Sequence, residues 1–160
     1  MRAVGVTAAG LAVLAAGCGC GSGHPAAAPP SPGRGVAAAR YLAIATAGNR
    51  HLDADFDRLD GPDHARLAPA RADLRDAAAT EHLFDRRLAA LPLPSATRAV
   101  ADRLVTANEA RAALTADAAR VPTLARLRPY ERRLTAANGP VEEQVRAIRR
   151  SLGLPPPATG

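Results

Sequence analysis

Prolines and glycines divide most of the chain into four segments of similar length, and apolar residues recur every three or four positions within each segment. No segment alternates apolar and polar residues as a half-buried β-strand does. Short connections between helices of similar length favour antiparallel neighbours. The pattern therefore predicts an all-α fold, an up-down-up-down antiparallel four-helix bundle.

The predicted helices cover residues 36–60, 67–91, 95–121 and 124–152. Ser95 and Thr123 are suitable N-cap residues for the third and fourth helices. Gly139-Pro140 falls in the middle of the fourth pattern, where a proline removes one backbone hydrogen bond and kinks or breaks a helix. The sequence leaves open whether this segment is one helix or two.

A short apolar leader precedes the four segments. It begins with the charged Met1-Arg2, continues through apolar residues to Leu14 and ends in small residues at Gly17. A charged start followed by an apolar stretch and then by small residues is typical of an export signal. The apolar stretch is shorter than the ~20 residues that cross a bilayer. We therefore expect residues 1–17 to be a cleaved signal peptide.

The end of this leader, Ala15-Ala16-Gly17-Cys18, resembles the lipobox of bacterial lipoproteins. Leu14 lies one position earlier than the large aliphatic residue of the usual motif. The resemblance implies cleavage after Gly17, a diacylglycerol on the Cys18 thiol and an acylated amino terminus. It places the protein on the outer face of the cytoplasmic membrane. A plain secretory signal with cleavage nearby remains the alternative.

Composition predicts the organisation of the rest. Residues 18–35 are rich in Gly, Pro and Ala and predict a flexible tether, whereas residues 36–154 form the predicted helical domain and 155–160 a disordered tail. The only cysteines are Cys18 and Cys20, so the folded part has no disulfide. The 143 residues after the leader suffice for one domain with its own hydrophobic core.

The formal net charge is +6, and all the basic residues apart from histidine are arginines. A positive surface would attract anionic lipid, a wall polymer or another envelope protein. Export and the presence of only two Tyr, two Phe and no Trp argue against nucleic acid as a partner. Membrane attachment through Cys18 is the partner that the sequence indicates most directly.

Three asparagines, each shortly after a Thr-Ala step, lie near the middle of predicted helices: Asn49, Asn108 and Asn138. The midpoints of antiparallel helices share one layer, so these amides are expected to meet, with Thr80, Glu81 or His82 of the second helix opposite. One interpretation is structural, in which the amides bond one another and fix the helix register. The other is a polar pocket for a small ligand.

Known catalytic and metal-binding motifs match this sequence poorly. The acidic stretch 51–64 has Arg58 where a calcium loop needs glycine and His64 where it needs glutamate. No Glu-x-x-His pair occurs for a di-metal site, and no serine has a plausible histidine and acid partner. The sequence thus predicts no enzyme, no bound metal and no cofactor.

The mature region as a whole resembles the small, Ala-rich helical lipoproteins of high-GC, actinomycete-type bacteria. The similarity rests on the lipobox, the Pro-rich tether, Tyr41-Leu42-Ala43-Ile44 and the ending Leu152-Gly153-Leu154-Pro155-Pro156. It implies location and architecture but no active residues. The expected function is a binding or scaffolding module at the cell envelope; the alternative is a small-ligand or metal carrier that uses the mid-bundle polar layer.

Overall fold

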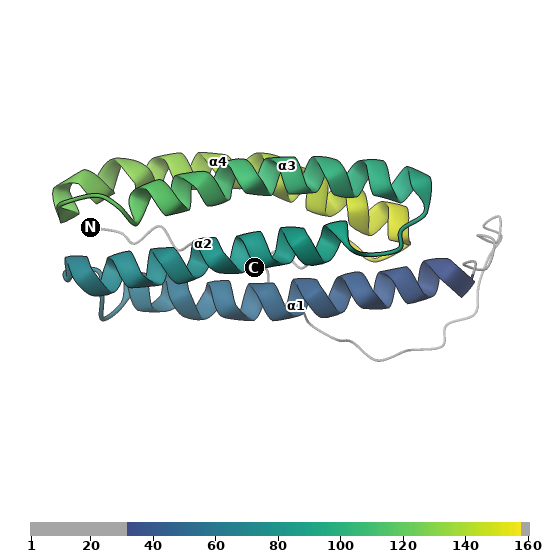
Figure 1. Cartoon of the computed structure of the whole chain (residues 1–160), viewed down its shortest axis with the longest axis horizontal. Coiled ribbons are helices and arrows are strands. Elements are labelled where there is room, and N and C mark those ends of the chain that lie inside the picture. The colour runs from purple at the N-terminus through teal and green to yellow at the C-terminus, as the bar shows by residue number, and fades with distance from the viewer. Residues whose placement is uncertain (1–31, 158–160) are drawn as a thin grey trace, which may run out of the picture.

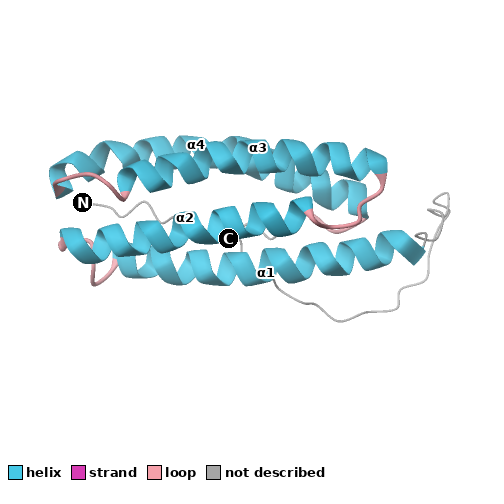
Figure 2. Cartoon of the chain, viewed as in Figure 1, coloured by secondary structure: helices cyan, strands magenta, loops and turns pink. Residues whose placement is uncertain are grey.

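Four helices form the structure, a computed structural model that describes residues 32–157. They are α1 (Pro32–Asp60), α2 (Leu67–Ala89), α3 (Ser95–Ala118) and α4 (Leu124–Leu152). Successive helices lie side by side and run in opposite directions (Figure 1). Short loops join them, and residues 32–157 contain no strand (Figure 2). The predicted all-α, up-down-up-down antiparallel bundle is confirmed.

The first helix begins earlier than the composition suggests. It starts at Pro32, so residues 32–35, expected to belong to the tether, are helical, and the boundary at residue 36 is four positions too late. Proline is well suited to a first helical position because the amide hydrogen that it lacks has no partner there. The expected signal peptide, Cys18, the rest of the tether and residues 158–160 lie outside the described residues.

Side-chain and backbone preferences explain both ends of α4 but not the start of α3. Pro94, not Ser95, is the N-cap of α3, and no side chain caps that end. The expected cap of α4 is confirmed, because the Thr123 hydroxyl accepts a hydrogen bond from the Arg126 amide at 3.3 Å. Gly153 ends α4 with a φ of 72°, a left-handed conformation that glycine adopts without strain.

The fourth helix is continuous. Pro129 and Pro140 both lie inside α4, and the helix extends through each of them to Leu152. An apolar stripe along α4 is at least half-buried at Leu134, Val141 and Val145 and buried at Leu127, Ile148 and Leu152. Burial of this stripe accounts for one helix instead of two, since packing of an apolar face supplies most helix stability in proteins.

Two separate hydrophobic clusters fill the bundle. One lies near the start of α1 and the end of α4, around Tyr41, Leu88, Leu104 and Ile148. The other lies toward the opposite end, around Ala70, Leu74, Ala118 and Leu127. Polar residues occupy the interior between them.

The four helices do not contribute equally to the packing of the bundle. Helices α2 and α3 each pack against two neighbours, whereas α1 and α4 touch each other only slightly. Among the described residues, no helix is both long and apolar enough to cross a membrane.

Candidate functional site

A buried ion pair lies at the centre of the polar layer. Glu81 of α2 is 1% exposed and Arg111 of α3 is 8% exposed. Arg111 Nη1 pairs with Glu81 Oε1. The pair is on the part of each helix that separates the two hydrophobic clusters. Charges so far from water persist in proteins only when they are paired and hydrogen-bonded.

Arg111 contacts every other helix. Its Nε donates a hydrogen bond to Asn138 Oδ1 of α4 at 2.7 Å. Its guanidinium carbon lies 5.6 Å from the ring centre of Phe56 in α1, within the range of a cation–π contact. Burial lowers the pKa of Arg111, because leaving water disfavours the charged form.

A second polar pair adjoins the first. Asn108 Nδ2 donates to the Glu81 carbonyl oxygen at 3.3 Å and to Asp85 Oδ1 at 2.9 Å. Burial raises the pKa of Asp85 to about 6; the Asn108 hydrogen bond opposes this rise and the charge of Glu109 adds to it. Asn108 thereby links α3 to one turn of α2.

The structure brings two of the three expected asparagines into this network. Asn108 is buried and Asn138 is half-buried, and both bond to members of the Glu81–Arg111 group. Asn49 is exposed and does not join them, so the three-asparagine layer is wrong at this position. The neighbouring Gly48 is half-buried instead, and a Cβ atom added there would lie 3.9 Å from the Phe84 side chain of α2.

The sequence predicted Thr80, Glu81 or His82 opposite the layer, and of these the structure places Glu81 there; Arg111 and Asp85 were missed. The buried positions of α3 step by four and three through Leu104, Asn108, Arg111 and Thr115. Counting onward from Asn108 at this spacing reaches Arg111. On α2 the buried positions Ala77, Glu81 and Asp85 are four residues apart, so the same helical spacing in the sequence also indicates Asp85.

Some carboxylate oxygens in this layer lack a hydrogen-bond partner within residues 32–157. They are both oxygens of Glu81, of which Oε1 has only the ion pair with Arg111, and Asp85 Oδ2; all three are inaccessible to solvent. Glu81 and Asp85 are one helical turn apart on α2. No cluster of three or more His, Cys, Asp or Glu residues in this part of the chain is arranged to hold a metal ion.

The acidic stretch of α1 is helical, as its apolar spacing indicates. Its charges pair locally, because Arg58 binds Asp55 on its own helix and donates from Nε to Asp73 Oδ1 of α2 at 2.8 Å. Burial raises the pKa of Asp55, and the hydrogen bond from Arg58 opposes this rise. These contacts join α1 to α2.

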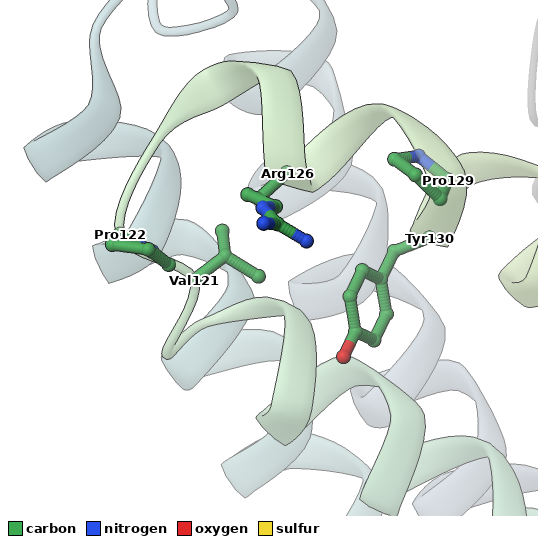
Figure 3. A pocket seen from close by; sticks show the side chains of 5 residues that line it. All are labelled: Val121, Pro122, Arg126, Pro129 and Tyr130. Carbon is green, nitrogen blue, oxygen red and sulfur yellow. The ribbon is translucent and has the colours of Figure 1, made fainter.

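Two hollows lie on the surface. The larger, about 430 Å³, is at the connection between α3 and α4, where the Arg126 side chain lies between Val121 and Tyr130 (Figure 3). Arg133 stacks on the Tyr130 ring at 4.7 Å from its centre. The smaller, about 100 Å³, is a groove between α1 and α2. Gly48, Phe84 and the exposed Leu83 are among the residues that line it. None of the three asparagines lines either hollow.

Comparison with known proteins does not add to this site. The chain matches no protein-family model, no curated protein and no solved structure.

Proposed function

We propose that this chain is a lipid-anchored, non-enzymatic module that binds or scaffolds other molecules on the outer face of the cytoplasmic membrane. The anchor rests on the lipobox-like Ala15-Ala16-Gly17-Cys18. Membrane attachment through Cys18 and a partner at the envelope are parts of the same proposal.

The pairing of polar groups inside the bundle supports this function best. Arg111 is shared between Glu81 and Asn138, and Asn108 between Asp85 and the Glu81 carbonyl. Catalysis needs an acid, a base or a nucleophile within reach of a substrate. These side chains instead bond one another between two apolar clusters, so their contacts favour an architectural role.

The anchor is tested on protein purified from native membranes. Mass spectrometry is expected to find a chain that begins at Cys18 and carries a diacylglycerol thioether. Cys18→Ala is expected to release the protein or to leave it unprocessed, while Cys20→Ala, the matched control, leaves attachment unchanged. Unmodified Cys18 in membrane-bound protein would refute the anchor.

The binding role is tested at the α1–α2 groove. Leu83 is 38% exposed at its edge, an unusual position for a large apolar side chain in this bundle. A photo-crosslinking residue at position 83 is expected to give one discrete adduct in intact cells, and the same residue at the exposed Ala113 of α3 is the control. Equal, diffuse labelling from both positions would argue against a specific partner there.

A carrier of small cations is the second candidate, because Glu81 Oε2 and Asp85 Oδ2 are buried without a hydrogen-bond partner in the described chain. A ligand that binds only the native state raises the Tm as its concentration rises. If the protein is a carrier, millimolar Mg²⁺, Ca²⁺ or Zn²⁺ raises its Tm, and Glu81→Gln abolishes the rise. An unchanged Tm with all three ions favours the scaffold.

A further inference from the structure

The end of the bundle at which the tether enters is strongly basic. This end is formed by residues 32–45, 86–101 and 144–157. It is the end where α1 begins and α4 finishes (Figure 1). These segments contain no Asp or Glu. They contain eight arginines, namely Arg34, Arg40, Arg86, Arg87, Arg98, Arg146, Arg149 and Arg150. We call this surface the basic end.

Most of these arginines face solvent without an ion-pair partner. Arg98 and Arg149 are used within the fold, where they donate to backbone carbonyls at the ends of helices α2 and α4. Arg146 pairs with Glu142. The remaining five are exposed and make no salt bridge within residues 32–157: Arg34, Arg40, Arg86, Arg87 and Arg150.

The opposite end of the bundle differs in charge pattern. There Arg58 pairs with Asp55 and Asp73, and exposed pairs also form between Arg66 and Asp63 and between Arg120 and Asp117. Residues 50–76 and 117–133 at that end hold ten arginines and nine carboxylates, so its net charge is close to zero, although Arg126, Arg128, Arg132 and Arg133 make no salt bridge within residues 32–157. The net positive charge is therefore concentrated at the basic end.

We infer that the basic end docks on an anionic lipid bilayer and holds the bundle against the membrane surface. The inference rests on the lipid anchor proposed above and adds a contact that the anchor alone does not require. Each arginine near an anionic bilayer adds favourable energy, and the attraction fades within a Debye length. Val36, 55% exposed in the first turns of α1, adds an apolar side chain to the same surface.

Covalent geometry favours a bilayer as the occupant of this surface. Thirteen residues lie between Cys18 and Pro32, so even fully extended this segment spans no more than about 50 Å. Pro32 is the first residue of α1 and belongs to the basic end. The anchor therefore keeps the five free arginines within about 50 Å of the lipid headgroups, whereas the opposite end of the bundle can lie farther away.

Docking is tested by energy transfer with the full, lipidated chain in vesicles. In a Cys20→Ser background, a donor dye is attached to Ala90→Cys, at an exposed position of the basic end. The matched donor is on Ala125→Cys, exposed in the first turn of α4 at the opposite end. The acceptor is a headgroup-labelled lipid. Vesicles of phosphatidylcholine are compared with vesicles in which a third of the lipid is phosphatidylglycerol.

The position 90 donor is expected to transfer more strongly in phosphatidylglycerol vesicles than in neutral ones, and the position 125 donor is not. Salt of about 1 M, where the Debye length is about 3 Å, should remove the difference. Arg86→Gln/Arg87→Gln should lower the ratio of docked to undocked protein by about 30-fold. Arg126→Gln/Arg128→Gln, which removes two exposed arginines from the opposite end, should leave the ratio unchanged.

The outcomes separate docking from anchoring. Chain that floats with neutral vesicles but shows equal transfer from position 90 in both lipids overturns the docking and keeps the anchor. Chain that does not float with neutral vesicles at all refutes the anchor. Equal effects of the two arginine double variants would also overturn the docking, because they would show a response to net charge without a preferred end.

Discussion

At the scale of single residues, the guanidinium of Arg111 connects the whole bundle. From α3 it pairs with Glu81 of α2, donates to Asn138 of α4 and lies over Phe56 of α1. No other side chain described in residues 32–157 has charged, hydrogen-bonding and aromatic contacts to three different helices. Its loss would leave the Glu81 carboxylate buried without its cation.

Arg111→Ala is expected to lower the free energy of unfolding by about 3–5 kcal/mol, the usual cost of removing one partner of a buried ion pair. The double variant Glu81→Leu/Arg111→Leu should recover most of this loss, because it leaves no uncompensated charge. Urea denaturation followed by circular dichroism measures both. A double variant as unstable as Arg111→Ala would contradict this account of the pair.

Asp85 makes stability depend on pH. Its folded pKa of about 6 lies above the ordinary carboxyl pKa of 3.8, so the native state binds more protons than the unfolded state between these pH values. The stabilising effect is complete below about pH 4 and is lost as the pH rises through about 6. Asp85→Asn should flatten this dependence and raise the stability at pH 7.5 by about 1–2 kcal/mol.

Denaturation at a series of pH values checks the prediction for Asp85. Asp102→Asn, at an exposed position of α3, is the control and should leave the pH profile unchanged. A wild-type profile that is flat between pH 4 and pH 6.5 would contradict the assignment to Asp85.

At the scale of helices, two exposed glycines at helix ends differ in backbone conformation. A Cβ atom added to Gly35 or to Gly153 would meet no atom within 4 Å beyond the adjoining residues and the helix backbone. Gly35 is helical in α1, whereas Gly153 has a φ of 72°. We expect Gly35→Ala to stabilise the protein by about 0.5–1 kcal/mol, because alanine is the better helix former.

Gly153→Ala should destabilise by about 1–2 kcal/mol, since a side chain disfavours the left-handed conformation. Thermal unfolding of the two variants side by side measures both effects. A stabilising Gly153→Ala, or equal shifts of Tm in the two variants, would contradict the proposed role of backbone conformation at the end of α4.

The helices were more predictable than their contacts. Their existence and order follow from apolar spacing and from Pro/Gly breaks, and Thr123 caps α4 as its side chain predicts. Whether Pro140 breaks α4 depends on tertiary packing, which a local pattern does not contain. Asn49 shows the same limit, because the face of α1 that turns toward α2 depends on tertiary packing, and Asn49 lies exposed beside Gly48, the residue nearer to Phe84.

At the scale of the whole molecule, the bundle has inner and outer helices. Eight residues are buried in α2 and eight in α3, but only four in α4. Helices α1 and α4 touch each other only slightly, so each is held mainly by one neighbour. Local opening is favoured where fewer contacts must break.

Native-state hydrogen exchange followed by mass spectrometry should therefore find the slowest amides in α2 and α3. Amides of α1 and α4 should exchange sooner at low denaturant, through opening of one outer helix at a time. The test contrasts helices within one molecule and so needs no variant. Exchange at one common rate in all four helices would show that the bundle opens only as a unit.

The buried ion pair between two apolar clusters also limits how the chain can misassemble. About half of the buried apolar residues are alanines, whose similar size makes neighbouring alignments of two helices nearly interchangeable. A slip by one turn would strand Glu81 or Arg111 against hydrocarbon, which costs several kcal/mol. The Glu81–Arg111 pair thus disfavours shifted alignments of the helices that small side chains of similar size would otherwise tolerate.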